Sequence, residues 1–185
     1  MKKRLVESFE VSIVATQMNL EIVFRNMVAG WRGLAYSELS ALLGYLTYLD
    51  KLHHNHHFIT IGDPQYGDHQ LFQRLYELTN SEFDSLGEKA VGLGGVSNVD
   101  LYTILQQANK WCSLSGPSEI VTVPGSSSLA RKSLDAELAF IKCIDLASTM
   151  LDENGLLTYG LDNMLAGMSD SHESSIYILK QRVSQ

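Results

Sequence analysis

The stretch from His57 to Glu88, HFITIGDPQYGDHQLFQRLYELTNSEFDSLGE, carries the strongest pattern in this sequence. If a helix begins near Asp68 and turns by about 100° per residue, three later carboxylates lie within roughly 100° of His69. They belong to Glu77, Asp84 and Glu88. Apolar side chains fill the opposite arc, which is the usual core face of an amphipathic helix. They are Leu71, Phe72, Leu75, Leu78, Phe83 and Leu86.

The polar stripe of this helix combines an imidazole with carboxylates. Asp84 and Glu88 are four residues apart, so both can direct oxygen atoms at one ion or at two adjacent ions. Imidazole and carboxylate together suit iron, manganese or zinc. The alternative is a solvated polar face with a histidine placed there by chance.

The spacing of the ligand types extends beyond one helix. His57 precedes His69 by twelve residues, Asp84 follows His69 by fifteen, and Glu88 comes four residues later, before the segment KAVGLGG at 89–95. This pattern, H-x11-H-x14-D-x3-E with a following LGG, resembles the Dps family of mini-ferritins. The resemblance covers about 39–183. Two departures are Phe58, where the family usually has tryptophan, and Gln73, where it often has an acidic residue.

The resemblance implies a dinuclear iron site shared between subunits across a twofold interface. It assigns His57 and His69 to one subunit and Asp84 and Glu88 to its partner, as both metal ligands and catalytic residues. It further implies a ferroxidase that oxidises Fe(II), preferably with hydrogen peroxide, and stores ferric iron in a hollow dodecameric shell. Such a protein protects against oxidative damage, and zinc or manganese are alternative occupants of its site.

Other chemistries and architectures are weighed against this interpretation. A metal centre inside one helix bundle is typically built from Glu-x-x-His pairs, and no glutamate in this chain has a histidine three residues later. A non-enzymatic DNA-binding or structural shell protein is a second hypothesis. A dinuclear metal-binding protein of other chemistry, such as a hydrolase or a zinc-occupied site, is a third.

Length and composition favour one domain that oligomerises. The 185 residues suffice for one sizeable core, and the chain is 45% hydrophobic but only 19% charged. The net charge of −7 opposes binding to nucleic-acid phosphates. A single basic cluster, Lys2, Lys3 and Arg4, is the sequence's support for DNA binding.

The cysteines and the hydropathy pattern predict a cytoplasmic protein without a membrane partner. Cys112 and Cys143 have neither metal-site nor redox-motif spacing, which is typical of thiols in a reducing compartment. No run of 18 or more apolar residues is present to span a membrane, and the first residues lack the features of a signal peptide.

The sequence predicts an all-α, ferritin-like four-helix bundle preceded by an additional helix. Residues 1–34 form an N-terminal extension with an amphipathic helix at 5–31, and 35–185 form the Dps-like domain. The four bundle helices are expected at about 35–57, 68–93, 127–152 and 156–183. A short helix at 97–112 lies in the long crossover, a connection known from ferritin-like folds.

The predicted core of these helices includes several leucine and isoleucine residues. They are Leu39, Leu42, Leu43, Leu46 and Leu49 in the first bundle helix, and Leu134, Leu138, Ile141 and Leu146 in the third.

The remaining histidines have no assigned role. His53 and His54 lie one helical turn before His57, so they either face the same pocket or form a surface cluster with their neighbours. His56 is also unassigned. His172 in the last helix is interpreted as a structural histidine, because a single histidine on a helix is more often a hydrogen-bonded structural residue than a metal ligand.

Overall fold

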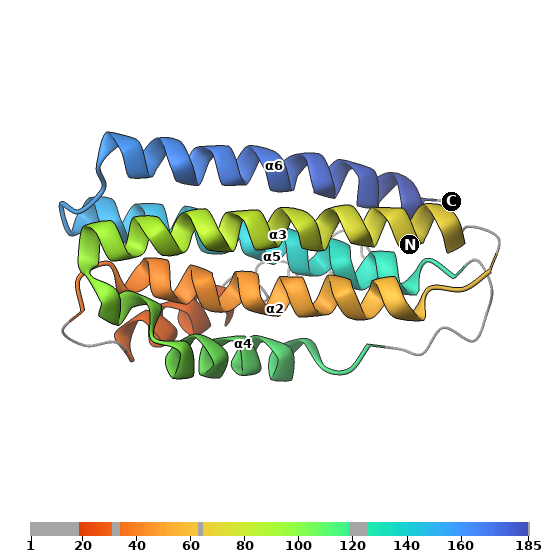
Figure 1. Ribbon diagram of the computed structural model, residues 1–185, viewed down its shortest axis with the longest axis horizontal. Helices are drawn as coiled ribbons and strands as arrows, with labels where there is room; N and C mark the ends of the chain where they lie inside the picture. The colour runs from red at the N-terminus through yellow and green to blue at the C-terminus, as the bar shows by residue number, and fades with distance from the viewer. Residues whose placement is uncertain (1–18, 31–33, 63–64, 119–125, 185) are drawn as a thin grey trace, which may run out of the picture.

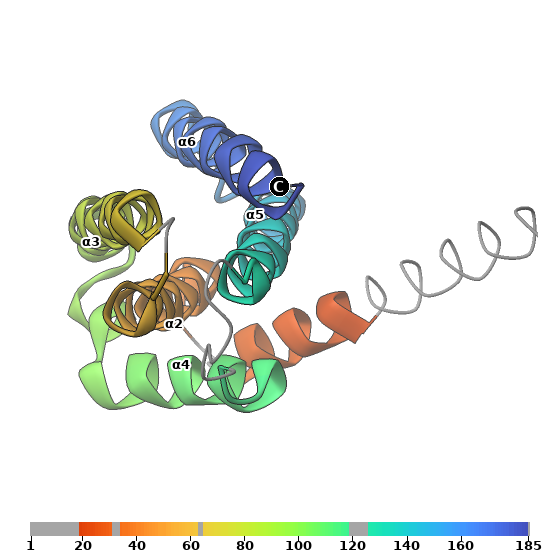
Figure 2. The same ribbon diagram turned by 90° about the vertical axis from the view of Figure 1, so that its right-hand side faces the viewer.

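The computed structural model describes residues 19–30, 34–62, 65–118 and 126–184. Four long helices form a bundle: α2 (Ser37–Ile59), α3 (Gln65–Gly94), α5 (Ser128–Glu153) and α6 (Tyr159–Val183) (Figure 1, Figure 2). The described ranges contain helices, turns and loops but no strand. None of their helices is long and apolar enough to cross a membrane.

The predicted long crossover is confirmed. It contains a short 3-10 helix, η1 (Val96–Val99), and α4 (Leu101–Ser115), which packs outside the bundle against α2 (Figure 2). α4 begins four residues later than predicted because Asp100 caps it: the backbone N–H of Thr103 donates to Asp100 Oδ2 at 3.0 Å. α3 begins three residues earlier than predicted, at Gln65.

α2 is the central helix of the molecule. It contacts α3, α4 and α5, so side chains around most of its circumference are buried. All five of its predicted core leucines are completely buried. The hydroxyl of Tyr45 donates to the carbonyl oxygen of Ala136 at 3.0 Å and thereby joins α2 to α5.

An ion pair joins the end of α6 to the start of α3. Arg182 in the last turn of α6 donates from Nε to Asp68 Oδ1 at 2.7 Å and from Nη2 to Asp68 Oδ2 at 3.0 Å. This paired geometry is the stronger form of a carboxylate contact. Because Asp68 lies in the first turn of α3, the pair fixes the helix start that precedes His69.

The described part of the N-terminal extension packs against its own subunit. Residues 19–29 are helical, and Phe24, Met27 and Val28 are buried in the same core cluster as α2. The carbonyl oxygen of Met27 accepts a hydrogen bond from Gln107 in α4 at 3.5 Å. The rest of the predicted helix and the basic cluster Lys2, Lys3 and Arg4 lie outside the described residues, and the division at residue 34 stays a prediction.

Close contact between α2 and α4 depends on Gly44, because a Cβ atom there would lie 2.3 Å from Cβ of Gln107. We expect Gly44→Ala to lower the free energy of unfolding by about 1–3 kcal/mol, because overpacking outweighs the gain in helix propensity. Gly167→Ala is the matched control, since nothing lies within 4 Å of its added Cβ. It should stabilise α6 by roughly 0.5–1 kcal/mol. Thermal unfolding at equal subunit concentration measures both, and an unchanged or raised stability of Gly44→Ala would contradict the close-contact argument.

Candidate metal centre

His57 near the end of α2 and His69 near the start of α3 lie face to face. Their ring centroids are 3.5 Å apart and their planes are inclined by 25°. His57 Nδ1 lies 2.9 Å from the carbonyl oxygen of His69, and His69 Nδ1 lies 3.0 Å from the carbonyl oxygen of His57. The loop between the two helices therefore brings together two histidines that the spacing pattern selected.

These reciprocal hydrogen bonds determine which ring nitrogen can bind a metal. A carbonyl oxygen only accepts, so Nδ1 of each histidine must carry the proton. When the ring is neutral, Nε2 then has the free lone pair. A hydrogen bond on one imidazole nitrogen that orients the other is the usual arrangement of a metal-ligating histidine. Both rings are half-buried, so they are held in place yet still reachable from outside.

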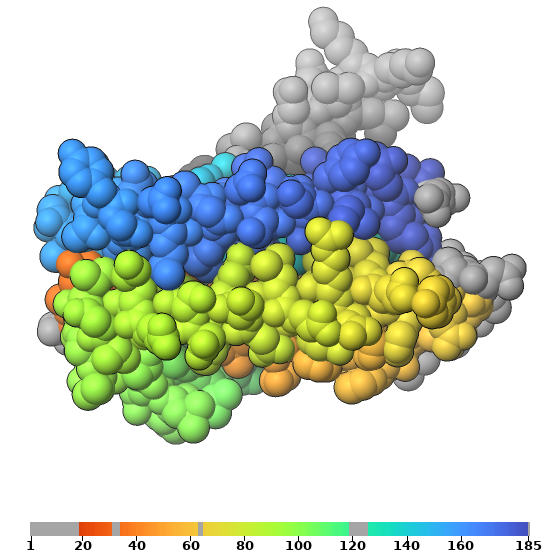
Figure 3. Space-filling view, turned by 45° about the horizontal axis from the view of Figure 1, so that its top comes forward, coloured from red at the N-terminus to blue at the C-terminus, as the bar shows by residue number. Residues whose placement is uncertain are grey.

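Asp84 and Glu88 lie on the same outer side of α3 but far from His69. The helix is continuous, so fifteen residues at a rise of about 1.5 Å place Asp84 roughly 22 Å from His69 along the axis. Both carboxylates are exposed, and α3 runs along the surface over its length (Figure 3). Within one subunit, the four predicted site residues therefore form two separate pairs: His57 with His69, and Asp84 with Glu88.

Within one subunit, neither pair amounts to a finished metal site. In the described ranges, no group of three or more His, Cys, Asp or Glu side chains is already placed to hold an ion. The assignment of His57, His69, Asp84 and Glu88 as ligands stays a prediction. It requires that a second copy of the chain bring its carboxylates to the histidine pair.

Apolar side chains are exposed beside the histidine pair. Phe58 is 73% exposed and Tyr66 is 75% exposed, and the ring of Phe58 lies 5.6 Å from that of His57. Large exposed apolar side chains are frequent at surfaces that contact another protein. This is the surface that a shared site would require to be covered.

The other histidines of α2 point in different directions. His54 is half-buried, stacks on Tyr76 with centroids 3.7 Å apart, and bonds through Nδ1 to Asp50 at 3.0 Å. The expectation that His53 faces either a surface cluster or the pocket of His57 is wrong. His53 is completely buried inside the bundle, as is His56.

A second polar cluster, built from His53, Glu82, Glu137 and His172, occupies the bundle interior, and we call it the internal cluster. Each residue comes from a different bundle helix, and their exposed fractions do not exceed 9%. His53 Nε2 lies 2.8 Å from Glu137 Oε1, and His172 Nδ1 is hydrogen-bonded to Glu137 Oε2. His172 Nε2 lies 2.7 Å from Glu82 Oε2. The two oxygens of Glu137 therefore face one histidine each.

The internal cluster holds a proton on both nitrogens of His172. Ionised carboxylates only accept hydrogen bonds, so a ring between two of them must be an imidazolium. Burial alone lowers the pKa of His172, but the charges and hydrogen bonds of Glu137 and Glu82 outweigh it and raise that pKa to about 10. For Glu137, burial raises the pKa, but His172 and His53 outweigh it and lower it to about 2.

The internal cluster continues through hydroxyl groups toward α4. Ser133 Oγ lies 3.2 Å from His53 Nδ1 and 2.8 Å from His56 Nδ1. His56 Nε2 in turn lies 3.0 Å from Ser118 Oγ. Burial, followed by the nearby His53 and Lys132, lowers the pKa of His56 to about 3, so this ring is neutral near neutral pH.

Sequence reasoning did not predict that His53, Glu82 and Glu137 belong to this cluster. It interpreted His172 as a structural histidine but did not identify the residues that contact it. The sequence did contain one indication of the cluster: its two glutamates lie on the apolar faces of their helices. Glu82 falls at roughly 220° from His69, inside the apolar arc of its helix. Glu137 likewise occupies the core position that was predicted for its neighbour Leu138, which is 42% exposed.

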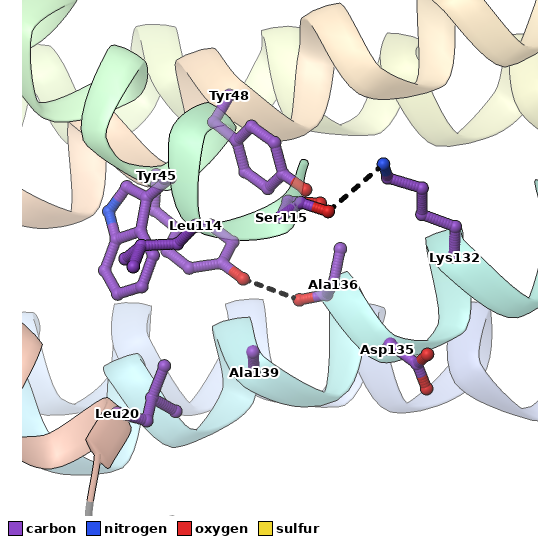
Figure 4. A pocket seen from close by; sticks show the side chains of 10 residues that line it. Leu20, Tyr45, Tyr48, Leu114, Ser115, Lys132, Asp135, Ala136 and Ala139 are labelled. Atoms are coloured by element: carbon purple, nitrogen blue, oxygen red, sulfur yellow. Dashed lines mark hydrogen bonds between the residues drawn. The ribbon is translucent and has the colours of Figure 1, made fainter. Parts of the chain in front are cut away.

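A pocket of about 280 Å³ lies between α2, α4, α5 and the N-terminal segment, and its lining includes no residue of the histidine pair or of the internal cluster (Figure 4). The hydroxyl of Tyr45 and the ammonium group of Lys132 reach it, but both donate to backbone carbonyl oxygens, at Ala136 and Ser115. These two groups join helices, and the wall is mainly apolar. None of the predicted metal ligands lines this pocket.

Comparisons with known proteins identify the architecture. No sequence family and no curated protein sequence matches the chain. Its structure is similar to a Dps homologue from the archaeon Halobacterium salinarum, with a TM-score of 0.65, 16% identity, and coverage of 80% of this chain and 78% of that one. Dps from Thermosynechococcus elongatus has a TM-score of 0.64 and 13% identity, with coverage of 89% of this chain and 95% of that one. Dps from Microbacterium arborescens, solved in a high iron form, has a TM-score of 0.62 and 10% identity, with coverage of 90% of this chain and 95% of that one. The chain therefore has a Dps-like ferritin fold.

The internal cluster predicts a stability maximum near pH 6.5 for metal-free protein. The raised pKa of His172 contributes stability that is complete below about 6.5 and is lost as pH rises toward 10. The lowered pKa of Glu137 contributes stability that is lost as pH falls from 4.5 toward 2. The lowered pKa of His56 removes stability as pH falls from 6.5 toward 3.

The loss of stability above pH 6.5 tests whether the raised pKa of His172 contributes to folding. Thermal or denaturant unfolding of chelator-treated protein should show stability falling above pH 6.5 by at most about 1.4 kcal/mol per pH unit. The contribution of His172 to this slope should vanish in His172→Gln, whereas Tyr177→Phe, an exposed change on the same helix, should keep it. Equal alkaline slopes in native protein and His172→Gln would refute the assignment.

Proposed function

We propose that this chain, which has a Dps-like ferritin fold, is a mini-ferritin that oxidises Fe(II) at a site shared between two subunits. His57 and His69 of one subunit and Asp84 and Glu88 of a second would bind the iron. The observation that supports this most strongly is the histidine pair: both Nε2 atoms are available as ligands, while Asp84 and Glu88 of the same chain lie roughly 22 and 28 Å from His69 along α3.

The donor set suits the proposed substrate. Two neutral imidazoles and two carboxylates offer nitrogen and oxygen ligands of the kind that bind iron, and zinc or manganese could compete for them. The two carboxylates would compensate two of the four positive charges of two bound Fe(II) ions. Asp84 and Glu88 make neither a hydrogen bond nor an ion pair with other described residues, so no internal partner would have to be displaced.

Two adjacent iron ions match the electron requirement of peroxide. Each Fe(II) releases one electron on becoming Fe(III), and hydrogen peroxide takes up two electrons and two protons to form two molecules of water. Oxidising two ions together avoids the one-electron step that releases hydroxyl radical. This chemistry would protect the cell against oxidative damage.

Storage of the ferric product requires an assembly. We propose a hollow homo-oligomer, a dodecamer as the family resemblance implies, in which the surface around Phe58 and Tyr66 contacts a second copy. The exposure of these side chains supports such a contact. Both cysteines are free thiols, which fits a reducing cytoplasm.

Removing the carboxylates should abolish rapid oxidation. Anaerobic loading with Fe(II) followed by hydrogen peroxide, monitored by ferric absorbance, should show an initial rate more than about tenfold lower in Asp84→Asn/Glu88→Gln. These substitutions keep side-chain size, so assembly should be retained.

A matched control is Asp145→Asn, which removes an exposed carboxylate of α5 that pairs with Lys142 at 3.3 Å. It should oxidise iron at the native rate. If the double variant assembles normally and also keeps the native rate, Asp84 and Glu88 are not part of the oxidation site.

Mixing subunits tests whether the site is shared. His57→Gln/His69→Gln and Asp84→Asn/Glu88→Gln should each be inactive as pure oligomers. Reassembled together at equal amounts, they should recover about a quarter of native activity, because half the twofold pairs are mixed and each mixed pair contains one intact site. Absence of recovery in verified mixed oligomers would mean that the site is not formed in this way.

A further inference from the structure

The internal cluster has no part in the proposed shared site. It lies inside a single subunit, its four residues come from α2, α3, α5 and α6, and it faces the opposite side of α3 from Asp84. Its composition, two imidazoles and two carboxylates in a buried position, is that of a metal-binding group rather than of a hydrophobic core.

The carboxylate of Glu137 lies between two histidines of this cluster. Glu137 directs Oε1 toward His53 Nε2 at 2.8 Å and Oε2 toward His172 Nδ1. One carboxylate is thus flanked by two imidazole nitrogens, all three residues having no exposed surface. Two histidines with one glutamate form a ligand set known to bind zinc or ferrous iron and to leave coordination positions open.

The outer nitrogens of both histidines are also engaged. His172 Nε2 is bonded to Glu82 at 2.7 Å, and His53 Nδ1 to Ser133 at 3.2 Å. Contacts of this kind orient a ligating imidazole, and a carboxylate behind the ring increases its basicity. Each inner nitrogen is therefore held toward Glu137 by a second residue.

We propose that His53, Glu137 and His172 form a metal-binding site inside each subunit, with Glu82 and Ser133 as positioning residues. The ligand class is a divalent transition-metal ion such as Zn²⁺, Co²⁺ or Fe²⁺. This site is independent of the shared site of His57, His69, Asp84 and Glu88. Each subunit would carry it complete.

In the described conformation, protons occupy the positions between these side chains. Nitrogen and oxygen atoms that bind one ion at about 2.1 Å are themselves separated by roughly 3.0–3.4 Å, so the present 2.8 Å contact must widen by about half an ångström. The proton of His172 Nδ1 leaves, and that of His53 moves from Nε2 to Nδ1. Two carboxylates then balance the two charges of the ion, with His172 neutral and still donating to Glu82.

Cobalt(II) provides a direct spectroscopic test in the full-length oligomer. In the background His57→Gln/His69→Gln, which removes the imidazoles of the shared site, we expect one bound Co²⁺ per subunit with visible ligand-field absorption. Adding His53→Gln should abolish this absorption. Adding His54→Gln, the adjacent histidine that bonds to Asp50 instead, should leave it unchanged.

Two further variants make the test independent of folding. Glu137→Gln should also lose the absorption, and Glu82→Gln, which keeps all three ligands, should weaken Co²⁺ binding by about 10–100-fold. Absence of Co²⁺ from the folded background protein, or equal retention in His53→Gln and His54→Gln, would overturn the proposal. Neither result bears on the peroxide assay, so failure of the shared site is recognised separately.

Discussion

The length and continuity of α3 are the constraint on which the other features of this molecule depend. One uninterrupted helix carries His69 near its start and Asp84 and Glu88 near its end. An α-helix cannot fold back on itself, so Asp84 and Glu88 stay roughly 22 and 28 Å from His69 along the axis in every copy of the chain. A site that combined His69 with Asp84 and Glu88, as we propose, would therefore have to form between copies, and its function would depend on assembly.

The same helix separates two polar environments. Glu82 and Asp84 are two residues apart, so their side chains leave the axis in directions about 200° apart. Asp84 is exposed, whereas Glu82 is 9% exposed and hydrogen-bonded to His172. Charges on the outer face are screened by water and counterions, while those inside interact in a lower dielectric. A cation on the outer face and a cation in the interior would therefore meet different electrostatic conditions, although both faces belong to one helix.

The sequence predicted the bundle well because apolar periodicity reports burial directly. The five leucines of α2 were found in this way, whereas the end of α3 at Gly94 was found from the glycine pair Gly94 and Gly95. The internal cluster was not, because a charged residue on an apolar stripe is read as an irregularity unless its partners are known. Those partners come singly from four helices, so no local spacing such as Glu-x-x-His links them. Conversely, the pair of His57 and His69 was found because their spacing is local.

Burying the charged groups of the internal cluster carries a desolvation penalty that opposes folding of the bundle. Burying ion pairs rarely stabilises a protein more than well-packed apolar side chains of the same volume would. Two carboxylates with one imidazolium also leave a net negative charge in the interior, and a solitary buried charge is costly. A divalent ion in place of one proton removes this excess, because it raises the charge of the cluster by one unit. The arrangement is therefore easier to explain as a cation site occupied by a proton than as a device for stability.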